Sequence, residues 1–207
     1  MKRFAADERA WADFFITRIG LILFAAVLLL SAFKVYPMFN EQQARAGMDA
    51  AASDIVSKIE AVDVVTVPGY KYVYAFDEKD KNKRIEISTE FVVARYNLST
   101  AWGERELVHA EPVVARVYPP NSYWSNTSGL RKMMSDLCVG KNGDAVSPLN
   151  FSGDKGKVDE MFISIERELA RTPFVPDMNR SMIIEKVMIY YNDGNKREAR
   201  DHVIIYQ

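Results

Sequence analysis

The feature that most constrains this chain is an apolar run over residues 14–36, where 18 of 23 side chains are apolar. As a helix this run would extend about 34 Å, more than the roughly 30 Å hydrocarbon core of a bilayer. Arg18 and Lys34 lie near its two ends, and their long side chains can reach the polar interfaces. The run therefore predicts a transmembrane helix, with Arg18, Lys34 and the aromatic Tyr36 as its interface anchors.

Two other kinds of segment have a similar apolar run. A buried core helix of this length would normally carry a polar face, and this run has none. A cleaved secretory signal would need a small-x-small site, which Ser31-Ala32-Phe33 matches poorly. The membrane helix is the interpretation that the residues favour.

The basic residues predict which side of the membrane each end occupies. Lys2, Arg3 and Arg9 precede the run, whereas its far flank carries Lys34 and Arg45, so the N-terminus is expected in the cytoplasm. Four Asn-x-Ser/Thr sequons all follow the run, where chance predicts roughly one. They indicate an exported and glycosylated C-terminal region, with candidate glycosylation sites at Asn97, Asn126, Asn150 and Asn179.

An amphipathic helix is predicted directly after the membrane run. Apolar or small residues recur three or four positions apart from Ala44 to Val62, which forms one stripe on a helix. Pro37 stands between the two segments, and we expect a single helix over about 12–63, kinked near Pro37. The stripe is expected to pack on the following domain, with packing on neighbouring copies as the alternative.

The remainder of the chain predicts an antiparallel β-sheet with two helices on one face, so the fold class is α+β. Tyr70, Tyr72, Tyr74 and Phe76 alternate with other residues, as in a sheet face buried under a helix or one on which a ligand stacks. Asp193-Gly194 between two β-rich runs signals a hairpin. The expected elements are a hairpin over 70–93, strands over 104–110 and 113–118, helices around 128–137 and 158–169, a loop over 142–156, and a final hairpin over 182–206.

The composition excludes several classes of function. A net charge of −1 and a pI near 6.2 disfavour nucleic-acid binding. One cysteine excludes an internal disulfide framework, and no nucleotide-binding or hydrolase motif is present. His109 beside Glu111 and His202 beside Asp201 fit structural or exposed roles. We therefore expect no catalytic, cofactor-binding or metal-binding residues and no enzymatic activity.

The segment from Lys2 to Ala10, which ends in Asp-Glu-Arg-Ala ahead of the apolar helix, resembles the leader of archaeal type IV pilin-like proteins. This resemblance implies that a prepilin peptidase cuts after Ala10, so that Arg9, Ala10 and Trp11 form the processing site. It also implies that the helix survives processing and later packs into a filament core. The residues after Ala10 and the charges of Arg18 and Lys34 depart from the usual pilin pattern.

Together these features predict a single-pass, membrane-anchored structural protein of the cell envelope, pilin-like and extracytoplasmic. Its expected partners are the lipid bilayer and other pilin-like subunits, reached through the transmembrane and stalk helices. The alternatives are a binding or accessory module of a secretion or sensing complex and, after it, an enzyme. The predicted organisation is a cytoplasmic leader over 1–13, a transmembrane helix over 14–36, a stalk helix over 37–66 and an α+β domain over 67–207.

Overall fold

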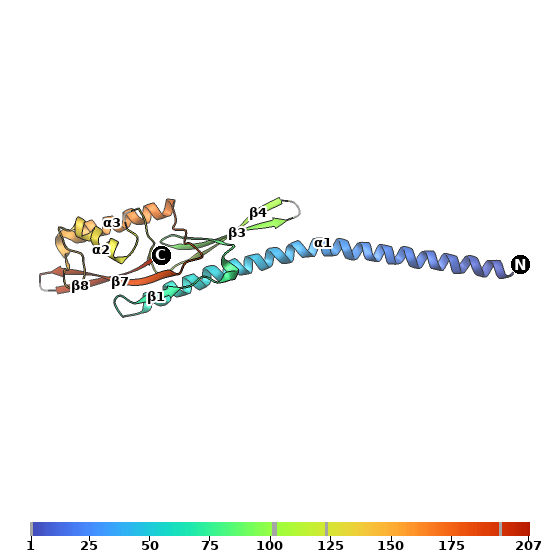
Figure 1. Cartoon of the computed structure of the whole chain (residues 1–207), viewed down its shortest axis with the longest axis horizontal. Helices are drawn as coiled ribbons and strands as arrows, with labels where there is room; N and C mark the ends of the chain where they lie inside the picture. Colours follow the sequence, from blue (N-terminus) through green and yellow to red (C-terminus); the bar gives the residue numbers. More distant parts are fainter. Residues whose placement is uncertain (1, 101–102, 123, 195) are drawn as a thin grey trace. The chain divides into compact units, whose positions relative to one another are not determined.

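The computed structural model describes residues 2–100, 103–122, 124–194 and 196–207. The fold is α+β: one long N-terminal helix, α1 (Lys2–Val64), precedes two sheets and two further helices (Figure 1). The chain divides into two compact units, Met1–Ala44 and Arg45–Gln207, and α1 contributes residues to both.

The prediction of one helix through the apolar run and the stalk is confirmed. Pro37 lies inside α1, and the helix begins at Lys2 rather than near residue 12. A proline inside a helix removes one backbone hydrogen bond and crowds the preceding turn, yet α1 continues through Pro37. The kink expected at Pro37 stays a prediction.

The last part of α1, residues 45–64, packs its apolar side into the core of the second unit, and we call it the spine. The predicted stripe is buried from Met48 onward, whereas Ala44 is only partly buried. The expectation that the stripe packs on the following domain is therefore confirmed. Seven side chains from this stretch belong to the core, namely Met48, Ala51, Ala52, Ile55, Val56, Ile59 and Val62.

A five-stranded sheet is built around the C-terminal hairpin. Its order is β1 (Lys71–Tyr74), β7 (Met182–Asp193), β8 (Lys196–Tyr206) and β5 (Val117–Tyr118), and β6 (Leu149–Asn150) also pairs with β7. The β7–β8 hairpin confirms the turn predicted from Asp193-Gly194, since Gly194 has a positive φ of 60° and Asp193 pairs with Lys196. Asn195 lies outside the described residues.

Two helices cover one face of this sheet, as predicted. Helix α2 (Thr127–Leu137) and helix α3 (Phe151–Arg171) lie together on one side of β7 and β8 (Figure 1). Leu130, Ile165 and Ile189, from the two helices and β7, belong to one buried cluster. On the other face, Tyr74 donates a hydrogen bond to Asp54 of α1 at 2.9 Å, so the sheet lies between two layers of helix.

A second, three-stranded sheet has the order β2 (Arg84–Ile87), β3 (Phe91–Thr100) and β4 (Gly103–Pro112). All of its pairings are antiparallel. Its inward face contributes Ile85, Ile87 and Val92 to the core. The Lys83 ammonium, just before β2, donates to the Gly47 carbonyl of α1 at 2.8 Å and ties this sheet to the spine.

The predicted hairpin over residues 70–93 is wrong. β1 pairs antiparallel with β7, and the segment expected as the second strand turns at Ser88 to form the β2–β3 hairpin. Alternation identifies a strand and its buried face but does not identify its partner. The polar segment between β1 and β2 forms a short 3₁₀ turn, Glu78–Asp80, whose buried Asp80 pairs with Lys83.

Three further expectations need correction. The strand expected over 113–118 is limited to its last two residues, which form β5. The strands form two sheets rather than one, and β5 and β6 pair in parallel with β8 and β7. The predicted loop over 142–156 ends early, because Asn150 caps α3 by accepting a hydrogen bond from the Ser152 N–H at 3.1 Å. Asp154 accepts the Asn150 N–H in return at 2.9 Å, which stabilises a helix start that carries two glycines.

The predicted aromatic face is a sheet face under a helix. Tyr74 is buried, Tyr72 and Phe76 are partly buried, and Tyr70 at the start of the row is exposed. The Lys58 ammonium of α1 lies 5.9 Å from the centre of the Tyr72 ring. The aromatic side chains therefore serve packing between β1 and α1.

Candidate functional site

The first candidate site is the apolar surface of α1 within residues 11–39. Its large side chains are exposed, with fractions from 47% at Phe14 to 77% at Phe33. Among the described residues, one helix is long and apolar enough to cross a membrane, and no part of its most apolar window is buried. In water, an exposed apolar surface of this extent would require a covering partner or a lipid phase.

The predicted anchor and processing residues all lie on α1. The Arg18 guanidinium stacks over the Phe14 ring at 4.4 Å, and the Trp11 ring lies 5.8 Å from that of Phe15. Tyr36 is 68% exposed. Arg9 and Ala10 belong to the helical backbone, but their side chains lie outside the described residues, and Lys34 is exposed.

The four sequon asparagines lie on the surface of the second unit, and all four are exposed. Asn126 caps α2 and Asn150 caps α3, each through its Oδ1 acceptor, so the Nδ2 atom to which a glycan would be attached is not used in the cap. Asn97 lies on β3, and Asn179 follows the turn at Asp177. Their glycosylation stays a prediction.

A cavity of about 560 Å³ lies beside His202, between β8, β5 and α3. The His202 ring stacks on Phe162 at 4.3 Å and meets the edge of Tyr118 at 5.6 Å. Burial lowers the pKa of His202 to about 4, so the imidazole is neutral at physiological pH. The guanidinium groups in the wall are paired, Arg116 with Glu166 at 3.0 Å and Arg200 with Asp159 at 3.6 Å.

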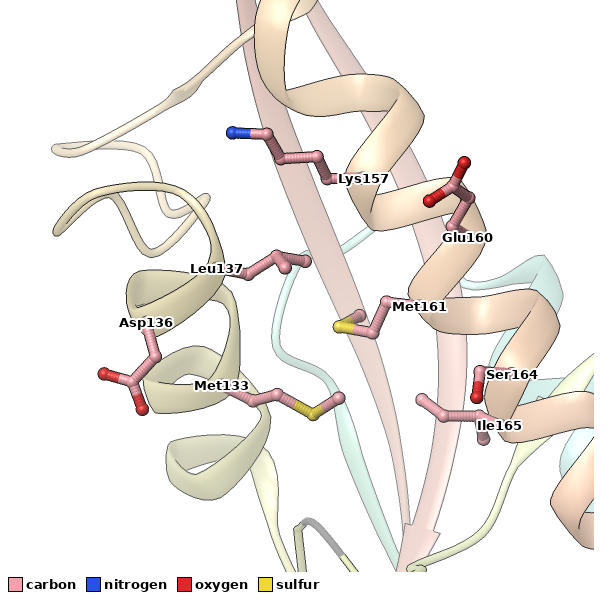
Figure 2. A pocket seen from close by; sticks show the side chains of 8 residues that line it. All are labelled: Met133, Asp136, Leu137, Lys157, Glu160, Met161, Ser164 and Ile165. Carbon is pink, nitrogen blue, oxygen red and sulfur yellow. The ribbon is translucent and has the colours of Figure 1, made fainter.

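A groove of about 510 Å³ runs between α2 and α3 (Figure 2). Met133 and Leu137 on α2 face Met161 and Ile165 on α3 across it. The charged groups of Asp136, Lys157 and Glu160 stand at its rim rather than on its floor (Figure 2). This arrangement suits an apolar ligand or peptide side chain, since methionines adapt to irregular apolar surfaces.

A third group of side chains joins α1 to β4. The His109 Nε2 atom lies 3.3 Å from an Asp49 carboxylate oxygen and 3.4 Å from one of Glu111. One donor atom from each residue lies within 4.8 Å of the other two. His109 and Glu111 are two positions apart on a predicted strand, which puts them on one face, but no sequence pattern indicates that Asp49 joins them.

Comparisons with known proteins give no relative from which a function can be transferred: no family model, curated protein or solved structure matches this chain.

Proposed function

We propose that this chain is a single-pass, membrane-anchored structural protein of the cell envelope, pilin-like, with a cytoplasmic N-terminus and an extracytoplasmic α+β unit. The observation that carries the proposal is the exposed apolar surface of α1 between Trp11 and Phe39, on the helix that later forms the spine of the folded unit. Such a surface is stable in lipid, and its length matches a bilayer.

The burial of the stalk stripe supports a particular mode of assembly. Residues 48–62 already pack in the core of their own unit, so they do not offer an apolar face to a second copy. Contacts between subunits would therefore use the transmembrane segment over 14–36. Helices in a membrane associate through close packing and polar side chains, and Thr17 and Ser31 supply hydroxyl groups in this segment.

A second candidate function is a membrane-anchored binding or accessory module of a larger complex. The groove between α2 and α3 favours it, because an apolar floor with a charged rim suits peptide side chains (Figure 2). Removal of residues 1–10 by a prepilin peptidase would favour a filament subunit over such a module.

The N-terminus of the mature protein tests the pilin-like part of the proposal. We expect N-terminal sequencing and intact mass of membrane-extracted native protein to give a start at Trp11, because a prepilin peptidase would remove residues 1–10. A start at Met1 would contradict processing and leave a simple signal-anchored protein. A start near Phe33 would identify the apolar run as a removed signal and would contradict the anchor.

The orientation can be tested with single cysteines. In a Cys138→Ser background, we expect Glu198→Cys to react with a membrane-impermeant maleimide on intact cells, whereas Ala12→Cys reacts only after permeabilisation. Both positions are exposed. The unmodified chain is the matched control, because Cys138 is 1% exposed and its burial raises the thiol pKa, so it should react only after unfolding. The reverse labelling pattern would contradict the proposed sidedness.

A further inference from the structure

The group formed by Asp49, His109 and Glu111 has the composition of a metal centre. It supplies one imidazole nitrogen and two carboxylate oxygens, and these donor atoms lie within 4.8 Å of one another. Zinc binds both His nitrogen and Asp or Glu oxygen, and its catalytic sites use three protein ligands and leave a fourth position for water or substrate. The sequence distance of 60 residues between Asp49 and His109 means that only the fold brings them together.

The distances fit ligands of one metal ion better than strong, charge-assisted hydrogen bonds. The two N···O separations, 3.3 and 3.4 Å, are longer than the roughly 2.7–2.9 Å of a charge-assisted hydrogen bond. Both carboxylates also converge on the same nitrogen, which carries one hydrogen at most. Ligands bound about 2.0–2.1 Å from one tetrahedral metal ion are roughly 3.3–3.4 Å apart, which matches both separations.

The backbone around these residues holds the ligands in place. His109 pairs with Ala94 and Glu111 with Val92, and both of these β3 partners are fully buried. Asp49 follows Met48, which is also fully buried in the core. Ligands carried by a helix and a paired strand are better positioned for a metal than ligands on loops.

The surroundings leave room for an ion and a further ligand. A cavity of about 270 Å³ is lined by Asp49 and His109 together with Arg45, Met48 and Val108. The three proposed ligands are exposed or partly buried, with side-chain exposures of 61% for Asp49, 30% for His109 and 32% for Glu111. An ion could therefore enter from solvent without any opening of the core.

We propose that Asp49, His109 and Glu111 bind one divalent transition-metal ion of the zinc class, with the fourth position facing this cavity. A mixed nitrogen and oxygen donor set suits Zn²⁺ and neighbouring first-row ions better than Ca²⁺ or Mg²⁺, which prefer oxygen alone. The metal would join α1 to the edge strand β4. The inference is independent of the proposed envelope function.

The test is metal titration of the full chain in detergent, prepared without a polyhistidine tag. We expect calorimetry to show one Zn²⁺ ion bound per chain, and we expect Zn²⁺ to raise the unfolding temperature. Co²⁺ bound at the same site should give the visible absorption of four-coordinate cobalt. Asp49→Asn, His109→Gln and Glu111→Gln keep side-chain size and should each weaken Zn²⁺ binding at least about tenfold. The matched control is Glu104→Gln, an exposed carboxylate on the same strand that should bind as the unmodified chain does.

Two results would overturn the inference. One is the absence of saturable Zn²⁺ binding up to about 1 mM. The other is binding that His109→Gln leaves unchanged, which would place the ion elsewhere. A variant whose circular dichroism spectrum equals that of the unmodified chain is folded, so its weaker Zn²⁺ binding reflects the lost ligand.

Discussion

A chain that begins at Arg45 is expected to fold and to remain in the supernatant after membranes are sedimented, whereas one that begins at Val67 is expected not to fold. The reason is that residues 45–64 belong to the second compact unit and supply seven buried side chains to its core. The five larger ones, at about 1.5–3 kcal/mol each, stabilise the fold by roughly 7–15 kcal/mol. That equals the whole stability of a typical domain, about 5–15 kcal/mol.

The measurement is circular dichroism and urea unfolding of both fragments. A synthetic peptide of residues 45–66, added to the fragment that begins at Val67, should restore part of the cooperative transition. Equal stability of the two fragments would contradict the role of α1 as a spine. Persistence of the longer fragment in the membrane pellet would instead contradict the assignment of the anchor to residues 14–36.

Acidification is expected to destabilise the folded unit through His202. Its pKa is about 4 in the fold and about 6.5 when the chain is unfolded, so between these values the unfolded state binds the extra proton. The free energy of unfolding is therefore not reduced by His202 well above pH 6.5, and it decreases as the pH falls from 6.5 toward 4. Between pH 7.5 and pH 5 the decrease is about 2 kcal/mol, or about 4–8 °C in unfolding temperature for a unit of this size.

The surroundings of His202 explain why its pKa is lowered. Burial is the largest cause of the lowered pKa, and Arg200 on the same strand lowers it further. Asp201 on β8 and Asp159 on α3 act in the opposite direction but are outweighed. Tyr118 and Phe162 contribute ring contacts rather than charge at these pH values.

The matched variants are His202→Phe, which keeps a flat ring against Phe162, and His109→Gln, which removes the other histidine. Urea unfolding of the metal-free chains, with a chelator present, at pH 7.5 and pH 5 should show the acid loss in the unmodified chain and in His109→Gln. Most of this loss should disappear in His202→Phe. The same loss in all three chains would assign the effect to other groups.

The elements of this fold could be predicted from local pattern, but their partners could not. The stripe from Met48 to Val62 and the Asp193-Gly194 turn each carry their signal within a few residues, and both predictions are confirmed. The partner of β1 lies more than 100 residues away on β7, and nothing in Tyr70–Phe76 encodes that pairing. The helix start at Asn150 is harder to predict, because the two glycines in its first turns favour a loop.

The candidate sites also differ in whether local sequence or tertiary contacts create them. The apolar run and the four sequons are contiguous motifs, so the sequence alone identifies them. The Asp49, His109 and Glu111 group depends on α1 and β4 meeting in space, and the α2–α3 groove depends on two helices packing side by side. Sites of this kind emerge only when tertiary structure is known.

The position of the spine at the start of the folded unit governs when the unit can be completed during synthesis. Helix residues 45–64 leave the ribosome long before β7 and β8, which form the centre of the larger sheet and end at Tyr206. The 117 residues from 65 to 181 take roughly 6–23 s to synthesise at about 5–20 residues per second. Until β7 and β8 are made, the apolar stripe lacks the larger sheet that packs beside it in the finished fold, so we expect the nascent chain to be prone to aggregation during this interval.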